Sequence, residues 1–144
     1  MENEVLNRLR DNIGKELTNS PSPLGSWLKG TIRKVEHGSL TIEFKVREDM
    51  TNTARILHGG ATAAIMDDTM GMTVASLGHE SFFATVNLSI DYLSSANIGD
   101  IITATTKINR EGRHIVNIDC VIVNAKGKLL SKGTSNLFKT VIPK

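Results

Sequence analysis

The chain has 144 residues, of which 40% are hydrophobic and 22% are charged, and its formal net charge is +2 at pH 7. This length is typical of one domain with a substantial core, and the composition excludes a disordered or membrane-embedded chain. Because the charge is small and scattered, we expect no nucleic-acid partner. The N-terminus lacks the apolar core of a signal peptide and no run approaches membrane-spanning length, so the sequence predicts a single cytoplasmic domain over residues 1–144 without a membrane partner.

Cys120 is the only cysteine, which excludes an intrachain disulfide and leaves no thiolate cluster for zinc. It stands in the apolar run 118–123. This setting favours a small core residue over a nucleophile, because a reactive thiol needs accessible, electropositive surroundings. The sequence also has no paired histidines at metal-binding spacing and no Gly-x-Ser-x-Gly motif. We therefore predict no bound metal.

The N-terminal segment predicts an amphipathic helix over about residues 2–17, because apolar side chains recur there at spacings of one, three and four. Gly14 weakens this helix, and the proline-containing segment 19–23 ends it. From residue 30 the period changes to two. The ranges 30–36 and 40–46 predict two strands that His37-Gly38 joins as a hairpin, and residues 47–55 follow as a polar loop.

A long helix is predicted within residues 56–77, where Ala, Met, Ile and Leu are frequent and the only charges are Asp67 and Asp68. A helix with so little charge is normally enclosed by the rest of the protein. At 100° per residue, the hydroxyl-bearing residues gather on one side and Asp67 falls almost opposite them. The hydroxyl side holds Thr62, Thr69, Thr73 and Ser76, and the side of Asp67 holds Ala63, Ala64, Met70, Gly71 and Val74.

An unpaired buried carboxylate is costly, so Asp67 must have partners, be protonated or face a cavity. On the helix alone, a packing aspartate bonded to a hydroxyl fits as well as a functional one. The preceding His58-Gly59-Gly60 favours a site, because two glycines at a helix start allow a ligand to approach unpaired N–H groups there. Asp68 lies 100° around the helix and is expected to make a structural hydrogen bond.

The last part of the chain predicts four consecutive strands linked by hairpins. Residues 82–92 alternate, with Thr85, Asn87, Ser89 and Asp91 on one face, and further strands are expected near 100–110, 113–125 and 128–139. These elements predict an α+β hotdog fold, in which a curved antiparallel sheet wraps around one central apolar helix. The edge strands of such a sheet need protection. Pairing two sheets edge to edge would provide it and would bring the helix start of one subunit near Asp67 of the other.

The string His58-Gly59-Gly60, six further residues and Asp67, with Asn52 upstream and Thr85 on the next strand, resembles the hotdog-fold acyl-CoA thioesterases of the phenylacetic-acid-degradation type. The resemblance covers roughly residues 30–138. It implies hydrolysis of aryl- or fatty-acyl-CoA to the free acid and CoA. The N-terminal helix would then lie over the body of the domain or cap the acyl site.

The resemblance also implies roles for the site residues. Asp67 would be the general base or the nucleophile, and the N–H of Gly59 would polarise the thioester carbonyl. His58 would orient that peptide or the carbonyl, while Asn52 and Thr85 would position water or the carboxylate across the subunit boundary. A carboxylate on an apolar face has a raised proton affinity, which suits a base.

Coenzyme A is part of this substrate, so no separate cofactor is expected, but its phosphates need cations or a helix start. The candidates are Gly60 at the helix start, the turn residues Arg110, Arg113 and His114, and Lys132 with Gly133 on the last strand. The resemblance further implies a homodimer or a tetramer formed by two dimers.

Two other hypotheses stay open. One is a hotdog dehydratase or hydratase acting on 3-hydroxyacyl chains, which would use a catalytic His paired with an acidic residue. The other is a regulator that binds acyl-CoA without cleaving it, although about 17 helical residues are too few for an appended DNA-binding domain. The sequence does not identify the acyl group.

Overall fold

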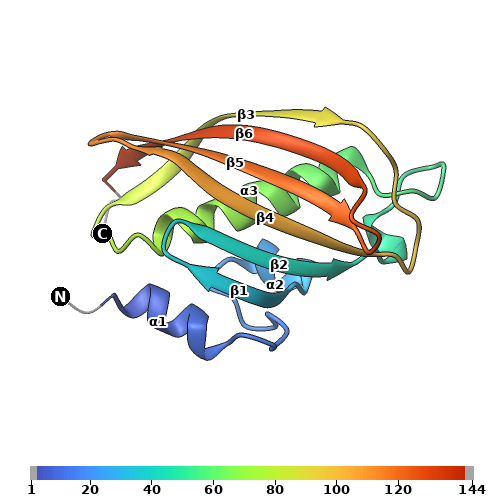
Figure 1. The fold of residues 1–144 in the computed structure, drawn as a ribbon, viewed down its shortest axis with the longest axis horizontal. Coiled ribbons are helices and arrows are strands. Elements are labelled where there is room, and N and C mark those ends of the chain that lie inside the picture. The colour runs from blue at the N-terminus through green and yellow to red at the C-terminus, as the bar shows by residue number, and fades with distance from the viewer. Residues whose placement is uncertain (1–2, 142–144) are drawn as a thin grey trace.

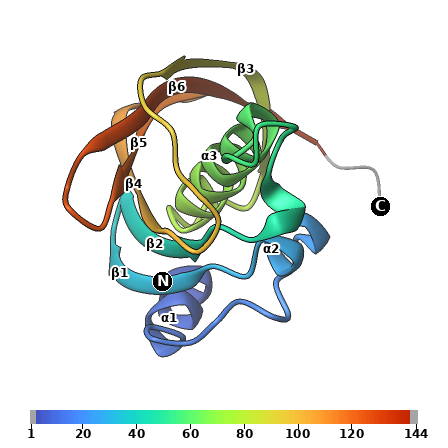
Figure 2. The same cartoon turned by 90° about the vertical axis from the view of Figure 1, so that its right-hand side faces the viewer.

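The computed structural model describes residues 3–141, in which one curved sheet wraps around a central helix (Figures 1 and 2). This arrangement confirms the predicted α+β hotdog fold. In chain order the elements are α1 (Glu4–Asp11), α2 (Pro23–Leu28), β1 (Thr31–Glu36), β2 (Ser39–Lys45), the short 3-10 helix η1 (Glu48–Met50), α3 (Gly59–Ala75), β3 (Phe82–Tyr92), β4 (Ile101–Glu111), β5 (Ile115–Asn124) and β6 (Leu129–Thr140).

The six strands are antiparallel in the order β1-β2-β4-β5-β6-β3. The prediction that the last four strands follow one another as hairpins is therefore wrong for the first of them. β3 pairs with β6, and β4 pairs with β2. The eight residues between β3 and β4 are too many for a tight hairpin, and Asn97 among them bridges to Ile56 just before α3. The connection therefore carries the chain from one edge of the sheet to its middle.

The threonine-rich side of α3 is the side that faces the sheet. Thr62, Thr69 and Thr73 are buried together with the apolar Ile65 and Met70. The hydroxyl of Thr73 satisfies its hydrogen-bonding potential inside the core, because it lies 2.7 Å from the hydroxyl of Thr106 on β4. Met70 and Val74, which the sequence analysis places on the side of Asp67, are buried as well, and Ala64, Asp67 and Gly71 are left half-buried.

The N-terminal helix is shorter than predicted. α1 ends at Asp11, and Gly14 adopts a φ of +85°, in a region that residues with a side chain rarely occupy. The following residues run along the outer edge of β1, where Leu17 donates to the carbonyl of Gly30 at 2.7 Å. The predicted start at residue 2 lies outside the described residues. α2, which Ser22 caps, was not predicted.

The predicted alternation along β3 is wrong at its centre. Its pairing with β6 shifts between Thr85 and Asn87, which makes Val86 the extra residue of a β-bulge. Beyond the bulge the alternation resumes with the opposite phase. Thr85 therefore lies on the side of the sheet that faces α3, together with Leu88, instead of on the outer face with Asn87.

One edge strand of the sheet is covered by a neighbouring segment of the chain, and the other is not. Residues 14–17 lie along β1, whereas the outer edge of β3 has no strand partner among residues 3–141. β3 has 11 residues, and its Val86 side chain is 65% exposed. A long open edge of this kind is a site for pairing with another chain. None of the helices in the described part of the chain is long and apolar enough to cross a membrane.

Candidate active site

Asp67 and Thr85 form one half of the candidate site. The hydroxyl of Thr85 donates a hydrogen bond to Oδ1 of Asp67 at 2.7 Å. The β-bulge makes this contact, because strict alternation along β3 would point Thr85 away from α3. The contact lies within one chain, so the predicted placement of Thr85 across a subunit boundary from Asp67 is wrong.

A cavity of ≈ 1090 Å³ opens beside this pair, between the N-terminal segment, α3 and the start of β3. Apolar side chains from all three regions line it together with Asp67 and Thr85. They include Val5, Leu9, Leu17, Met72, Phe82 and Phe83. The N-terminal segment also contributes polar lining, including Arg8, Asn12 and Glu16, so a ligand beside Asp67 would meet both apolar and polar side chains.

Asp68 has the structural role that the sequence predicted. Burial raises the pKa of the Asp68 carboxyl, a hydrogen bond from Ser22 opposes that rise, and the neighbouring Asp67 adds to it. α2 packs closely against this carboxylate, because a Cβ at Gly25 would lie 2.8 Å from its Oδ2. Asp68 therefore joins α2 to α3.

His58 and Gly59 form the other half of the candidate site, at the start of α3. His58 is the N-cap, and its Nδ1 accepts a hydrogen bond from the N–H of Gly60 at 2.8 Å. The carbonyl of Gly59 accepts from the hydroxyl of Tyr92 at 2.8 Å. Among residues 3–141 no acceptor bonds the N–H of Gly59. That N–H is thus available to an incoming oxygen at the positive end of the helix dipole.

Asn52 and His58 both line a second, open cavity of ≈ 540 Å³. Its Oδ1 accepts from the backbone N–H of Ala54 at 2.9 Å and of Ile56 at 3.4 Å. Because the loop uses the oxygen, the group that Asn52 can offer a ligand is its Nδ2 amide, a donor.

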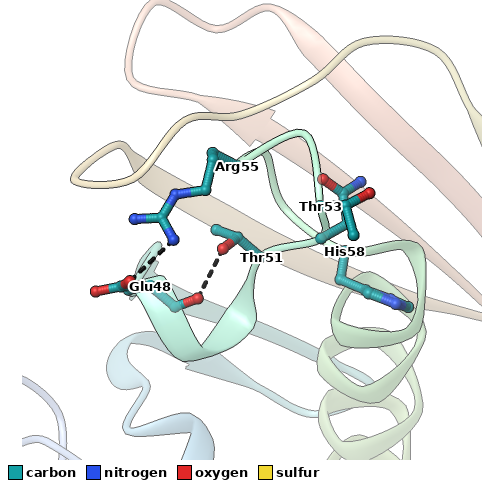
Figure 3. A pocket seen from close by; sticks show the side chains of 6 residues that line it. Glu48, Thr51, Thr53, Arg55 and His58 are labelled. Atoms are coloured by element: carbon teal, nitrogen blue, oxygen red, sulfur yellow. Dashed lines mark hydrogen bonds and ion pairs between the residues drawn. The ribbon is translucent and has the colours of Figure 1, made fainter.

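Arg55 is a cation in this cavity that the sequence analysis did not single out. It bonds Glu48 at 2.9 Å (Figure 3), and its φ of 64° is uncommon for a residue other than glycine. Within a polar loop, no sequence pattern distinguishes Arg55 from its neighbours. Only the folded path of the loop brings Arg55 into the cavity that His58 also lines.

One chain does not bring the two halves together. Gly59 and Asp67 are eight positions apart on the same helix, about 12 Å along its axis. Asp67 and Thr85 line the larger cavity, whereas Asn52 and His58 line the smaller one. A carboxylate and an N–H at that separation cannot both reach one thioester carbonyl.

The predicted phosphate-binding residues are also dispersed. Arg110, Arg113 and His114 are exposed at the β4–β5 turn, where the adjoining Glu111 lies 2.7 Å from His79, beyond the end of α3. Lys132 lies on β6 near Asp91, at 4.0 Å. This is the part of the sheet next to the start of α3.

Gly133 and Cys120 are explained by packing. A Cβ at Gly133 would lie 2.7 Å from Sδ of Met66, so glycine is needed where β6 passes α3. Cys120 is buried, and burial raises the pKa of its thiol to about 12, as suits the predicted core residue. The predicted contact of Gly133 with coenzyme A stays a prediction.

Comparison with known proteins identifies the family. The sequence profile of the thioesterase superfamily matches residues 54–131. Human acyl-coenzyme A thioesterase 13 is 30% identical over 106 residues, which cover 73% of this chain and 76% of the relative. The mouse protein of the same name is 31% identical over the same length.

Two solved structures share the fold. A hypothetical thioesterase protein from Streptococcus pneumoniae TIGR4, crystallised with coenzyme A, matches with a TM-score of 0.74 and 28% identity over 80% of this chain and 91% of that one. The PaaI protein of the Escherichia coli phenylacetic acid degradation operon matches with a TM-score of 0.82 over 96% of this chain and 95% of that one, but at 19% identity it supports the fold alone. The predicted resemblance is confirmed, and the chain belongs to the thioesterase superfamily.

Proposed function

We propose that this protein hydrolyses acyl-CoA thioesters to the free acid and CoA, in an active site shared between two subunits. The observation that carries the proposal is the carboxylate of Asp67, oriented by Thr85 and facing a cavity that apolar side chains line in part. The relatives named acyl-coenzyme A thioesterase and the S. pneumoniae thioesterase crystallised with coenzyme A support the substrate class.

The chemistry needs an activated oxygen and an oxyanion site. Asp67 either takes a proton from the attacking water or attacks the carbonyl carbon itself, and the C–S bond breaks as the oxyanion collapses. In the second case water hydrolyses the resulting anhydride. Because the CoA thiolate is a good leaving group, little acid assistance is required. Thr85 keeps one oxygen of the carboxylate bonded, so the other points to the substrate.

The start of α3 supplies the oxyanion site in this proposal. The free N–H of Gly59, the Nδ2 amide of Asn52 and the Nε2–H of His58, whose Nδ1 accepts from Gly60, are all donors to a developing negative charge. Because Asp67 of the same chain is too distant, these donors act on a carbonyl that is attacked by Asp67 of the partner subunit or by the water which that carboxylate activates. Arg55, in the same cavity, joins the predicted candidates for the CoA phosphates.

The open edge of β3 provides a geometry for such a dimer. β3 runs antiparallel to α3. Thr85 in the first half of β3 bonds Asp67 in the middle of α3, and Tyr92 at the end of β3 bonds Gly59 at the start of α3. Suppose that two β3 strands pair antiparallel about a two-fold axis through Ser89. With the bulge counted as one extra residue, Thr85 of one subunit then lies opposite Tyr92 of the partner subunit.

This register satisfies two independent requirements. Leu88 lies opposite Ile90 of the partner subunit, and both side chains face α3 as a continuous sheet demands. The residues bonded to Thr85 and Tyr92 are brought together as well, so Asp67 approaches Gly59 of the partner subunit. A shift by one residue would break both relations, because directly opposed residues share a face of the sheet.

Ser89→Cys is expected to give a disulfide-linked dimer on mild oxidation, seen on a non-reducing gel. Directly opposed residues of an antiparallel pair have Cβ atoms about 4.5–5.5 Å apart, which small shifts reduce to disulfide geometry. The only native cysteine, Cys120, is buried and does not interfere.

Ser95→Cys is the matched control, because Ser95 is exposed just beyond β3. The two copies of Tyr92, where β3 ends, would already lie about 20 Å apart in this register, so no self-disulfide should form at Ser95 beyond it. Equal cross-linking of both variants would refute the register.

The activity is tested by mixing the purified protein with acyl- and aryl-CoA esters and following release of the free thiol. We expect turnover of at least one class, at a rate typical of enzymes, about 1–10³ s⁻¹. Binding without thiol release would favour a sensor, and addition of water to an enoyl-CoA would favour a hydratase. Either result would overturn the proposed hydrolysis.

A further inference from the structure

We infer that the face of α3 beyond Asp67 limits the length of the acyl chain that the site accepts. Gly71 and Ala75 are the two residues that set this limit, Gly71 nearer to the carbonyl and Ala75 farther from it. The inference rests on the proposed function, since it takes Asp67 as the point where the carbonyl is held. It adds the two residues that select the length of the acyl chain.

The spacing along the helix supports this inference. Asp67, Gly71 and Ala75 are each four residues apart, so they lie on one face of α3 at intervals of about 6 Å. All three line the larger cavity. A chain whose carbonyl is held at Asp67 would therefore pass Gly71 first and Ala75 next.

Gly71 combines free space beside it with an ordinary backbone conformation, whereas Gly14, Gly99 and Gly127, which also have free space, adopt a positive φ. A Cβ added at this position would meet nothing within 4 Å among the described residues, whereas a Cβ at Gly30, Gly25 or Gly133 would meet atoms closer than 3.0 Å. Packing thus explains those three glycines but not Gly71. Glycine is also a poor helix former, so its presence inside α3 has no local structural advantage. The space that it leaves belongs to the cavity.

The walls of the cavity indicate what fills that space. Leu9 and Leu17 approach from the N-terminal segment, and Phe83 approaches from the start of β3. At the end away from Asp67, His79 lies 2.7 Å from Glu111, and its ring centroid is 5.4 Å from that of Phe83. An apolar chain gains from the walls, and the polar pair limits how far such a chain extends.

The test compares Gly71→Leu and Ala75→Leu by kcat/KM for acetyl-, hexanoyl-, decanoyl- and palmitoyl-CoA. Each methylene kept out of an apolar site lowers kcat/KM by about fourfold. Gly71→Leu is expected to lower kcat/KM from hexanoyl-CoA upward relative to acetyl-CoA. Ala75→Leu should affect only the longer chains. Gly71→Ala should shift the profile in the same direction as Gly71→Leu, but less.

Ala125→Leu, on the exposed β5–β6 turn, is the control and should keep the wild-type profile. Thermal unfolding identifies a variant that fails to fold; if Gly71→Leu fails, Ala75→Leu decides. An active wild type with the same chain-length profile in both leucine variants would overturn the inference and leave the proposed function standing.

If the wild type releases no thiol from any ester, the proposed function fails. The inference about Gly71 and Ala75 is then tested by calorimetric binding of decanoyl-CoA. Weaker binding to Gly71→Leu than to Ala125→Leu would support it. Equal binding would overturn it.

Discussion

Asp67→Asn is expected to lower kcat by about 10²- to 10⁴-fold, the usual contribution of a positioned base. The amide is nearly isosteric with the carboxylate, and its oxygen can still accept the hydrogen bond of Thr85. It can neither take a proton from water nor attack a thioester. We therefore expect fold and substrate affinity to be retained, which thermal unfolding and calorimetry with an acyl-CoA would verify.

Asp68→Asn is the control for this result, because both carboxylates are neighbours on α3. Asp68 is bonded to Ser22 and packed against Gly25, so its substitution should mainly affect the contact between α2 and α3. Its effect on kcat should be much smaller than that of Asp67→Asn. A strong loss with Asp68→Asn and full turnover with Asp67→Asn would transfer the catalytic role to Asp68.

Most of the secondary structure could be predicted because its signals are local. The low charge of residues 59–75 and the alternation at 39–45 each reflect the surroundings of one element. The positions of His58 and Gly59 at the start of α3 also follow from local sequence, since an N-cap and its glycines need no distant partner.

The order of the strands could not be predicted, because it depends on contacts between distant residues. β3 pairs with β6 although residues 93–128 lie between the two strands, and no hairpin signal predicts that pairing. The sequence pattern does not predict the bulge at Val86 either, because polar and apolar residues alternate without interruption through 82–92. Its effect on the site is nevertheless large, because it turns Thr85 from the outer face toward Asp67.

The predicted extent of the N-terminal helix is wrong for a related reason. The spacing of apolar residues continues to Leu17, but the helix ends at Asp11, Ile13 is exposed in the turn that follows, and Leu17 packs against the core from beyond that turn. The backbone of residues 14–17 is bonded to the edge of β1, which offers hydrogen bonds that a local pattern cannot anticipate. The same segment forms one wall of the cavity beside Asp67.

A mixed dimer of Asp67→Asn and Asn52→Asp chains is expected to regain activity that neither variant has alone. Asn52→Asp keeps the oxygen that accepts from Ala54 and Ile56, but it replaces the donor at the oxyanion site by an anion. We expect it to lower kcat by about 10²- to 10³-fold. In a shared site, one of the two sites of the mixed dimer combines an intact Asp67 with an intact Asn52.

Co-expression in equal amounts makes half of the dimers mixed, so activity should return to roughly one quarter of wild type. A chain that carries both substitutions, co-expressed with wild type, provides the opposite test. Every site of that mixed dimer has one defect, so only wild-type dimers would work, again roughly one quarter of the total. If each site lay within one chain, the first pair would stay inactive and the second would keep about one half. The two co-expressions together therefore distinguish a site built by two subunits from one built by a single chain.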